Sequence, residues 1–298
     1  MFKDRDVICF FGDSITASGY WMAEIYQEMR KKYKIKCYNC GVPGAEAWQG
    51  IQYLHSECLI HNPDYVVLMF GMNDFGLGLY GEFCKEKDIE LKKAEKRRIH
   101  RENYEAIIKA CKDFGSEVII CLPTPHDEVS DVATECIPYQ VALEEGAKFH
   151  LEMAEKYGCK VVNLKDAMLS MLGKKKVIND DRVHPNVDGQ HVMAQTFLKE
   201  MGIIEECDFD TPFEFEPWNK ERFDIEFDKI QFLNYVDICV RHREAKPYTD
   251  EELIAYVKKD YEKYKNKEEF IPEAYRKFLE YGEKRMVFKG EIAKRTIF

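Results

Sequence analysis

VICFFGDS, at residues 7–14, joins a short apolar run to a polar turn of glycine, aspartate and serine. An apolar run of this length, rich in branched and aromatic side chains and bounded by turn residues, is typical of a buried β-strand. The sequence therefore predicts a strand at residues 7–11. Four further runs of the same kind follow, at residues 35–39, 65–70, 118–122 and 160–163.

Longer stretches of helical character separate these runs, because their apolar residues recur at three- and four-residue spacing. Gly115, Gly158 and Gly202 stand where helices of this kind are expected to end. Strands that alternate with helices predict a parallel sheet covered by helices on both faces. The fold class is therefore α/β. The predicted helices span residues 20–33, 92–114, 141–157 and 187–201.

The amino-acid composition changes at residue 205, where an acidic and aromatic segment begins. We therefore divide the chain into a catalytic domain, residues 1–204, and a mostly helical C-terminal extension, residues 205–298. Thr249 and Glu252 form a capping box for one of its helices. The extension is a candidate surface for a homo-oligomer, or a cover for the site. Its predicted helices span residues 225–243, 250–265 and 272–284.

The composition excludes several classes of partner. The 298 residues include 54 acidic and 44 basic side chains, so the net charge is −10. We therefore expect no excess of positive charge that could neutralise the phosphates of a nucleic acid. No apolar run approaches the roughly 20 residues that cross a bilayer. The first residues lack the apolar core of a signal peptide, and the 11 cysteines are scattered through apolar stretches. We therefore expect a cytoplasmic protein.

Polar residues follow several of the predicted strands, where an open parallel sheet binds its ligands. Residues 12–14 are Gly-Asp-Ser, Gly41 follows the second strand, and residues 71–74 are Gly-Met-Asn-Asp. Asp181 and His184 stand three residues apart in the last loop. These side chains are expected to converge on one edge of the sheet.

In these four blocks and their order, residues 6–200 resemble the GDSL or SGNH hydrolase family. Ile15 stands where the name-giving leucine of that family often does. The resemblance implies a flavodoxin-like three-layer α/β/α sandwich with five parallel strands. It also implies an oxyanion hole made by the backbone N–H groups of Ser14 and Gly41 and by the side-chain amide of Asn73.

A serine hydroxyl needs a general base, and the base needs a partner that fixes its tautomer. Ser14, His184 and Asp181 fit these three catalytic roles, and Asp180 is the rival carboxylate. A nucleophile elbow of the Gly-x-Ser-x-Gly type is absent at this serine, because residue 16 is threonine. Phe75 and His126 are candidate substrate-binding residues.

The expected activity is hydrolysis of carboxylic esters through an acyl-enzyme, with short acyl groups favoured, in particular acetyl groups on carbohydrates. The alternatives are a lysophospholipase or thioesterase and a non-catalytic ligand-binding protein. The expected partner is a small-molecule ester, and no cofactor is expected. No metal is expected either, because the pair Cys37 and Cys40 lacks the second ligand pair that zinc requires.

Overall fold

The computed structural model describes residues 2–82 and 84–216. The five predicted strands form one sheet, in which every neighbouring pair is parallel and the order is β2-β1-β3-β4-β5. This order is that of flavodoxin-like folds. The strands are β1 (Val7–Gly12), β2 (Lys36–Gly41), β3 (Tyr65–Met69), β4 (Glu117–Cys121) and β5 (Lys160–Val162).

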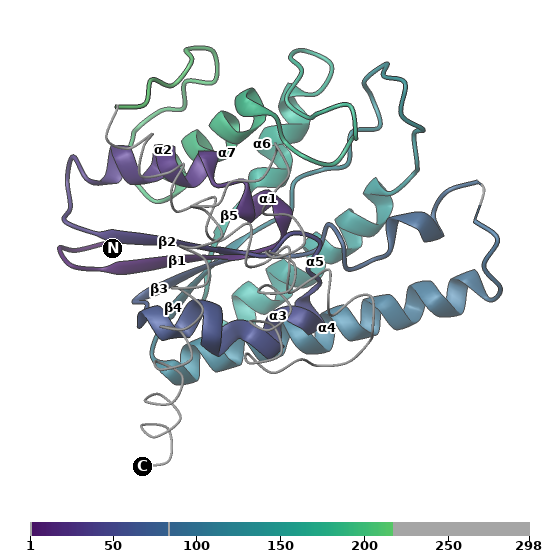
Figure 1. Cartoon of the computed structure of the whole chain (residues 1–298), viewed down its shortest axis with the longest axis horizontal. Helices are drawn as coiled ribbons and strands as arrows, with labels where there is room; N and C mark the ends of the chain where they lie inside the picture. Colours follow the sequence, from purple (N-terminus) through teal and green to yellow (C-terminus); the bar gives the residue numbers. More distant parts are fainter. Residues whose placement is uncertain (1, 83, 217–298) are drawn as a thin grey trace, which may run out of the picture. The chain divides into compact units, whose positions relative to one another are not determined.

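Helices cover both faces of the sheet. In Figure 1, α2 and α7 lie on one side of the strands, and α3 and α4 lie on the other. The predicted three-layer sandwich is therefore confirmed. The helices are α1 (Ser14–Ala17), α2 (Tyr20–Met29), α3 (Ala47–Tyr53), α4 (Ile89–Phe114), α5 (Gln140–Tyr157), α6 (Leu164–Met171) and α7 (Val187–Glu200), with the π-helical turn η1 (Leu54–Cys58) and the 3-10 turns η2 (Leu59–His61) and η3 (Leu77–Leu79).

Glycines end the long helices as the sequence predicted. Gly115 and Gly158 follow α4 and α5 with φ of 100° and 62°, and their N–H groups bond to carbonyls of the last turn. Only glycine adopts this left-handed conformation without steric cost. Helix α2 ends at Met29, four residues earlier than expected, and four of the five residues that follow, Arg30, Lys31, Lys32 and Lys34, are charged and exposed.

Alternating side chains of β1 fill the two halves of the core. Phe10 packs edge-on against Trp21 of α2, with ring centroids 5.1 Å apart. Phe11, on the opposite face, packs in the same manner against Phe70 and Tyr53, at 5.3 Å and 5.8 Å. Each fully buried aromatic side chain stabilises the fold by about 1.5–3 kcal/mol relative to its exposed state. Strand β1 is thus the centre of both hydrophobic layers.

The carboxyl ends of β1, β2 and β3 meet at one edge of the sheet. Gly12 pairs with Gly41 on one side and with Met69 on the other. A Cβ atom at Gly12 would lie 2.2 Å from the carbonyl oxygen of Met69, so only glycine allows this approach. The strand order reverses between β1 and β3, and this switch point is where open α/β sheets bind ligands.

The chain divides into two units between residues 223 and 224, and only the first contains described residues. The described part of the extension, residues 205–216, packs on the α/β unit. Phe215 lies edge-on against Tyr20 at 4.7 Å, and Gln27 Nε2 donates to the carbonyl of Glu214 (3.0 Å). The domain boundary at 204 stays a prediction, and the three helices predicted beyond it lie outside the described residues.

Among residues 2–82 and 84–216, no helix is long and apolar enough to cross a membrane.

Candidate active site

Ser14 is the first residue of α1, directly after β1. Asp13 caps this helix, since its carboxylate accepts the N–H of Ile15 (2.9 Å). The carboxyl of Asp13 is buried, and burial raises its pKa to about 7. Ser14 thus stands in the first turn of α1, at the carboxyl end of β1.

The imidazole of His184 bridges Ser14 and Asp181. Its Nε2 lies 2.8 Å from Ser14 Oγ, and its Nδ1 lies 2.7 Å from Oδ2 of Asp181. The other carboxylate oxygen accepts the backbone N–H groups of Val183 and His184, at 3.0 Å and 2.9 Å. The three residues are thus brought together in one hydrogen-bonded chain, half-buried at the serine and open to solvent at the aspartate.

Asp181 is the carboxylate that faces His184, while Asp180 turns away to pair with Lys176. Burial disfavours the charged form of Asp181, but the N–H groups of His184 and Val183 outweigh it and lower the pKa of this carboxyl. Asp181 is therefore ionised at neutral pH. An ionised partner fixes the proton of His184 on Nδ1 and leaves Nε2 as the basic nitrogen toward Ser14.

A short loop holds His184 in place. Ile178 and Pro185 form an antiparallel bridge, and the N–H of Asn179 donates to the carbonyl of His184 (2.9 Å). Between the aspartate and the histidine, Arg182 has a φ of 64° and a buried guanidinium. That guanidinium donates to backbone carbonyls of the loop between β4 and α5, so it joins two loops beside the site. The carbonyls belong to Asp127, Ser130, Val132 and Thr134.

Asn73 lies in the turn after β3, and its side-chain amide donates to the carbonyl of Ala45 (3.1 Å). A primary amide carries two N–H donors, so this bond orients the group and leaves a second donor. The neighbouring Asp74 is buried and accepts the N–H of Ala47 at the start of α3 (2.7 Å). Two hydrogen bonds thus fasten the Asn73 turn to the loop after β2.

The N–H of Gly41, for which the resemblance implied a role in the oxyanion hole, has a partner within the protein. Its N–H donates to Oδ1 of Asn39 (3.0 Å). A Cβ atom at this position would lie 2.3 Å from the backbone nitrogen of Ala17, so the close approach that requires glycine is to helix α1. Three residues later, Gly44 is exposed and has a φ of 75°, in the loop that Asn73 contacts.

The two candidate substrate-binding residues are both buried. Phe75 is 2% exposed and packs edge-on against His100, with ring centroids 4.9 Å apart. His126 is also 2% exposed, and its backbone N–H donates to Gln140 (3.0 Å). Burial lowers the pKa of His126. Neither side chain is accessible to a substrate in this structure.

A buried polar chain beneath the site was missed by the sequence analysis. Oδ1 of Asp74 lies 2.8 Å from Nδ1 of His100, and Nε2 of His100 lies 2.8 Å from Nε2 of His150. The His150 ring stacks on Tyr104 at 4.1 Å. Burial lowers the pKa of His150 well below its ordinary value, so this imidazole is neutral. No spacing signal reveals the chain, because its members come from a turn and two helices far apart in sequence.

A model of the GDSL-like Lipase/Acylhydrolase family matches residues 10–192. The chain belongs to this family. The match extends over β1 to α7 and includes Ser14, Asn73, Asp181 and His184. As a GDSL-like hydrolase the protein is a carboxylic ester hydrolase, as the sequence predicted.

Relatives of this GDSL-like hydrolase share its fold at low identity. An acetylxylan esterase from Geobacillus stearothermophilus is 23% identical over 220 residues, which cover 66% of this chain and 94% of the relative. A solved structure of an acetylxylan esterase from the same organism has a TM-score of 0.55 at 20% identity, over 67% of this chain and 95% of that one. A gut microbial diltiazem-metabolizing enzyme has a TM-score of 0.61 at 23% identity. That match covers 68% of this chain but only 48% of the other, so the chain spans about half the length of that protein.

Proposed function

We propose that Ser14, His184 and Asp181 form the catalytic triad of this hydrolase and that the reaction passes through an acyl-enzyme. The observation that carries the proposal is the unbroken hydrogen-bonded chain from Ser14 Oγ through both ring nitrogens of His184 to Asp181. A serine hydroxyl within 2.8 Å of a basic nitrogen, with an ionised carboxylate on the other nitrogen, is an activated nucleophile.

In the first half of the reaction, Ser14 Oγ attacks the ester carbonyl carbon while its proton passes to Nε2 of His184. The imidazolium then gives that proton to the leaving alcohol, and an acyl group remains on Ser14. In the second half, a water molecule gives a proton to His184 and attacks the acyl carbon. The acid leaves, and the proton returns to Ser14. Asp181 stabilises the imidazolium in both halves.

The negative charge on the tetrahedral intermediate needs donors in fixed positions. We assign this role to the N–H of Ser14, the second N–H of Asn73 and the N–H of Gly44. Gly44 replaces Gly41 in this proposal, because the Gly41 N–H donates to Asn39 and Gly44 lies in the loop that Asn73 contacts. Each donor of this kind stabilises the transition state by roughly 2.7–4 kcal/mol.

Acetyl esters on carbohydrates are the substrates that we propose. The support is the curated relative, an acetylxylan esterase that is matched over nearly its whole length. A second support is Trp48, in the first turn of α3, which is 37% exposed and whose indole N–H donates to Glu46 (3.2 Å). A half-exposed indole offers an apolar face with a polar edge, a surface on which a sugar ring can stack.

The decisive test compares the wild type with Ser14→Ala on p-nitrophenyl acetate, butyrate and octanoate and on acetylated xylo- and manno-oligosaccharides. We expect acetate release from the sugars, a preference for acetate over octanoate, and a loss on the order of 10⁶-fold in kcat for Ser14→Ala. Ser170→Ala, which changes an exposed serine of α6, serves as the matched control. Equal activity of wild type and Ser14→Ala would refute the triad and favour a ligand-binding role. Turnover of octanoate but not acetate would favour a lysophospholipase or thioesterase.

The role of Trp48 has its own measurement. Trp48→Ala is expected to raise KM for acetylated oligosaccharides about tenfold and to leave the kinetics of p-nitrophenyl acetate unchanged, because the small ester has no sugar to stack. Phe114→Ala removes another exposed aromatic side chain, at the end of α4, and is the control. An unchanged KM for the oligosaccharides would exclude Trp48 from the sugar site.

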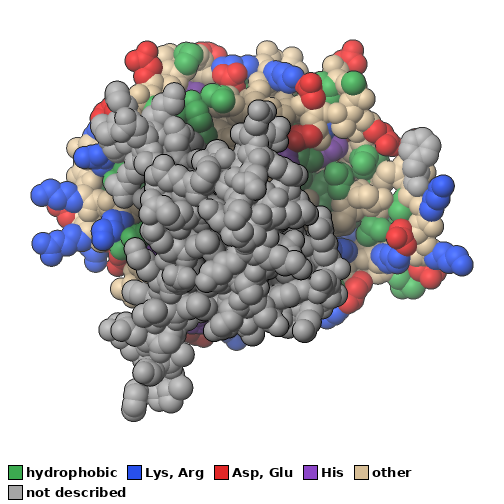
Figure 2. Space-filling view, viewed as in Figure 1, with side chains coloured by type: hydrophobic (Ala, Val, Ile, Leu, Met, Phe, Trp, Pro, Cys, Tyr) green, Lys and Arg blue, Asp and Glu red, His purple; other side chains and the backbone are tan. Residues whose placement is uncertain are grey.

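We propose that the protein acts in the cytoplasm on a small-molecule ester and without nucleic acid. The ten cysteines among residues 2–82 and 84–216 are all free thiols, which suits a reducing compartment. Figure 2 shows acidic and basic side chains interspersed on the visible described surface, rather than a field of one sign. Self-association through the C-terminal extension is the remaining part of this proposal.

A further inference from the structure

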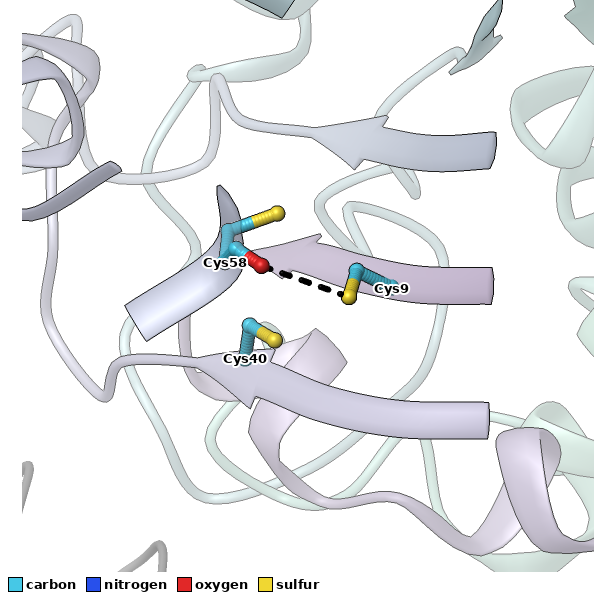
Figure 3. Close-up of side chains that lie close together, drawn as sticks. All are labelled: Cys9, Cys40 and Cys58. Atoms are coloured by element: carbon cyan, nitrogen blue, oxygen red, sulfur yellow. Dashed lines mark hydrogen bonds between the residues drawn. The ribbon is translucent and has the colours of Figure 1, made fainter. Parts of the chain in front are cut away.

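Three cysteine side chains converge in the core beneath η1. The Sγ atoms of Cys9, Cys40 and Cys58 all lie within 4.8 Å of one another, and each residue is at most 3% exposed. Figure 3 shows that the three side chains lie close together and come from three different elements, β1, β2 and η1. Cys9 Sγ also lies 3.6 Å from the carbonyl oxygen of Cys58. We call these three residues the thiol cluster.

The strand register creates the thiol cluster. Cys40 pairs with Phe11, so it shares a sheet face with Phe11 and with Cys9 two residues earlier. Cys37 is three residues from Cys40 and therefore lies on the opposite face, among the core residues that pack around Phe10. The pair Cys37 and Cys40 thus forms no site. Cys40 meets two cysteines that are distant in the sequence instead.

Cys58 is the last residue of the π-helical turn η1, which packs on β1 and β2. A π-helical turn is rare and is found frequently at functional sites. A π-helical turn widens the helix, and η1 places the sulfur of Cys58 against the sheet. The turn also lies close to solvent, because His55 is exposed and Ser56 and Glu57 are half-buried. A cation could therefore reach the thiol cluster by local opening of η1.

The donor set selects the kind of ligand. The thiol cluster offers three sulfur atoms, and sulfur-only donors favour soft cations such as Cu(I), Cd²⁺ and Zn²⁺ over Mg²⁺ or Ca²⁺. A cation with metal–sulfur bonds of about 2.3 Å holds three coplanar sulfurs about 4.0 Å apart. The observed sulfurs need only a small inward movement to meet this geometry.

We propose that the thiol cluster is a binding site for one thiophilic d10 cation, held by the thiolates of Cys9, Cys40 and Cys58. Three metal–sulfur bonds form, three S–H bonds break, and the three protons leave to solvent. A divalent cation with three thiolates leaves a single negative charge in the core. Cu(I) would leave two negative charges there, so the cost of burying charge favours a divalent ion.

The test uses Cd²⁺ as the probe, on the full chain, reduced with a phosphine and kept anaerobic. The parent protein for this test carries serine in place of every exposed or half-buried cysteine and in place of the one cysteine outside the described residues. Only buried thiols then remain. These replaced positions are Cys84, Cys136, Cys159, Cys207 and Cys239. Cys40→Ala removes a cluster thiol, and Cys121→Ala removes a buried thiol outside the cluster as the matched control. Hydrolysis of p-nitrophenyl acetate and circular dichroism report folding, and Cys58→Ser replaces Cys40→Ala if the latter does not fold.

We expect the parent to bind one Cd²⁺ per chain, with a thiolate-to-metal absorption band whose intensity corresponds to three thiolates. Cys40→Ala is expected to weaken binding at least tenfold, whereas Cys121→Ala leaves it unchanged. Competition by Zn²⁺ and by Cu(I) then ranks the candidate ions. The proposal is overturned if the folded parent shows no such band, or if the two alanine variants bind Cd²⁺ equally well, since the cluster would then be core packing only.

Discussion

Gly41 ends β2 and Gly44 lies three residues later, and our proposal assigns the oxyanion contact to Gly44. The Gly41 N–H already donates to Asn39, and its Cα packs against the backbone of α1. We therefore predict that in a crystal structure of the phosphonylated Ser14 adduct the phosphonyl oxygen accepts the N–H of Gly44. A contact at about 2.9 Å to Gly44 is expected. A contact to Gly41, with the Asn39 bond broken, would restore the expectation from the family resemblance.

Asn73 is the residue to which we assign the side-chain donor of the oxyanion hole. Asn73→Ala is expected to lower kcat about 10²–10³-fold, with KM for p-nitrophenyl acetate changed less than threefold, because the amide acts on the charge that develops in the transition state. Steady-state kinetics at saturating ester measure this effect. Asn103→Ala, which removes an amide that bonds only within α4, is the control. A rise in KM with unchanged kcat would place Asn73 in substrate binding instead.

Asp13 links the site to the pH dependence of stability. Its pKa is raised by burial from 3.8 to about 7, so between these values the folded protein keeps a proton that the unfolded chain has released. The free energy of unfolding therefore falls as pH rises through this window, by up to about 1.4 kcal/mol per pH unit. Asp13→Asn stays neutral and can still accept the Ile15 N–H. Urea unfolding at pH 5 and pH 8 should show a smaller loss of stability in Asp13→Asn than in wild type, and Asp113→Asn, at an exposed position, should behave as wild type.

At the scale of elements, the chain from Asp74 through His100 to His150 connects the Asn73 turn to α4 and α5. His100→Ala removes a buried hydrogen-bond partner of both Asp74 and His150 and is expected to destabilise the protein by about 1–3 kcal/mol. Urea unfolding measures this loss, with His55→Ala, at an exposed histidine, as control. The double variant with Asp74→Asn should lose less unfolding free energy than the sum of the losses in the two single variants. Strict additivity would show that the contact does not couple the turn to α4.

The elements that the sequence predicted are those with a strong local signal. All five strands and the helices α2, α4, α5 and α7 followed from apolar spacing and turn residues. Helices α1, α3 and α6 and the turn η1 were missed, because four to eight residues are too few to show a helical period. The same limit applies at the site. Ser14, Asp181 and His184 were readable as motifs, whereas the thiol cluster and the buried chain from Asp74 to His150 depend on strand register and tertiary packing that no local pattern encodes.

At the scale of the whole molecule, the C-terminal extension begins on the surface of the α/β unit. Residues 205–216 cover part of α2 and α7, and Nε2 of His191 donates to the carbonyl of Asp208 (2.7 Å) while Nδ1 binds buried Glu24 (2.9 Å). We therefore predict that a chain of residues 1–216 keeps the thermal midpoint and the esterase activity of the catalytic unit. A chain of residues 1–204 should unfold at a lower temperature, because it loses the cover over Tyr20 and the acceptor for His191.

Two measurements on these truncated chains separate the roles that the extension could have. Thermal unfolding of residues 1–216 and 1–204 locates the end of the folded unit, and equal midpoints would support a boundary at 204. Light scattering of the full chain and of residues 1–216 tests self-association. A dimer that becomes a monomer on truncation supports an oligomer interface within residues 217–298. An unchanged number of chains per particle, together with an altered ratio of octanoate to acetate turnover, would instead indicate that this segment influences access to Ser14.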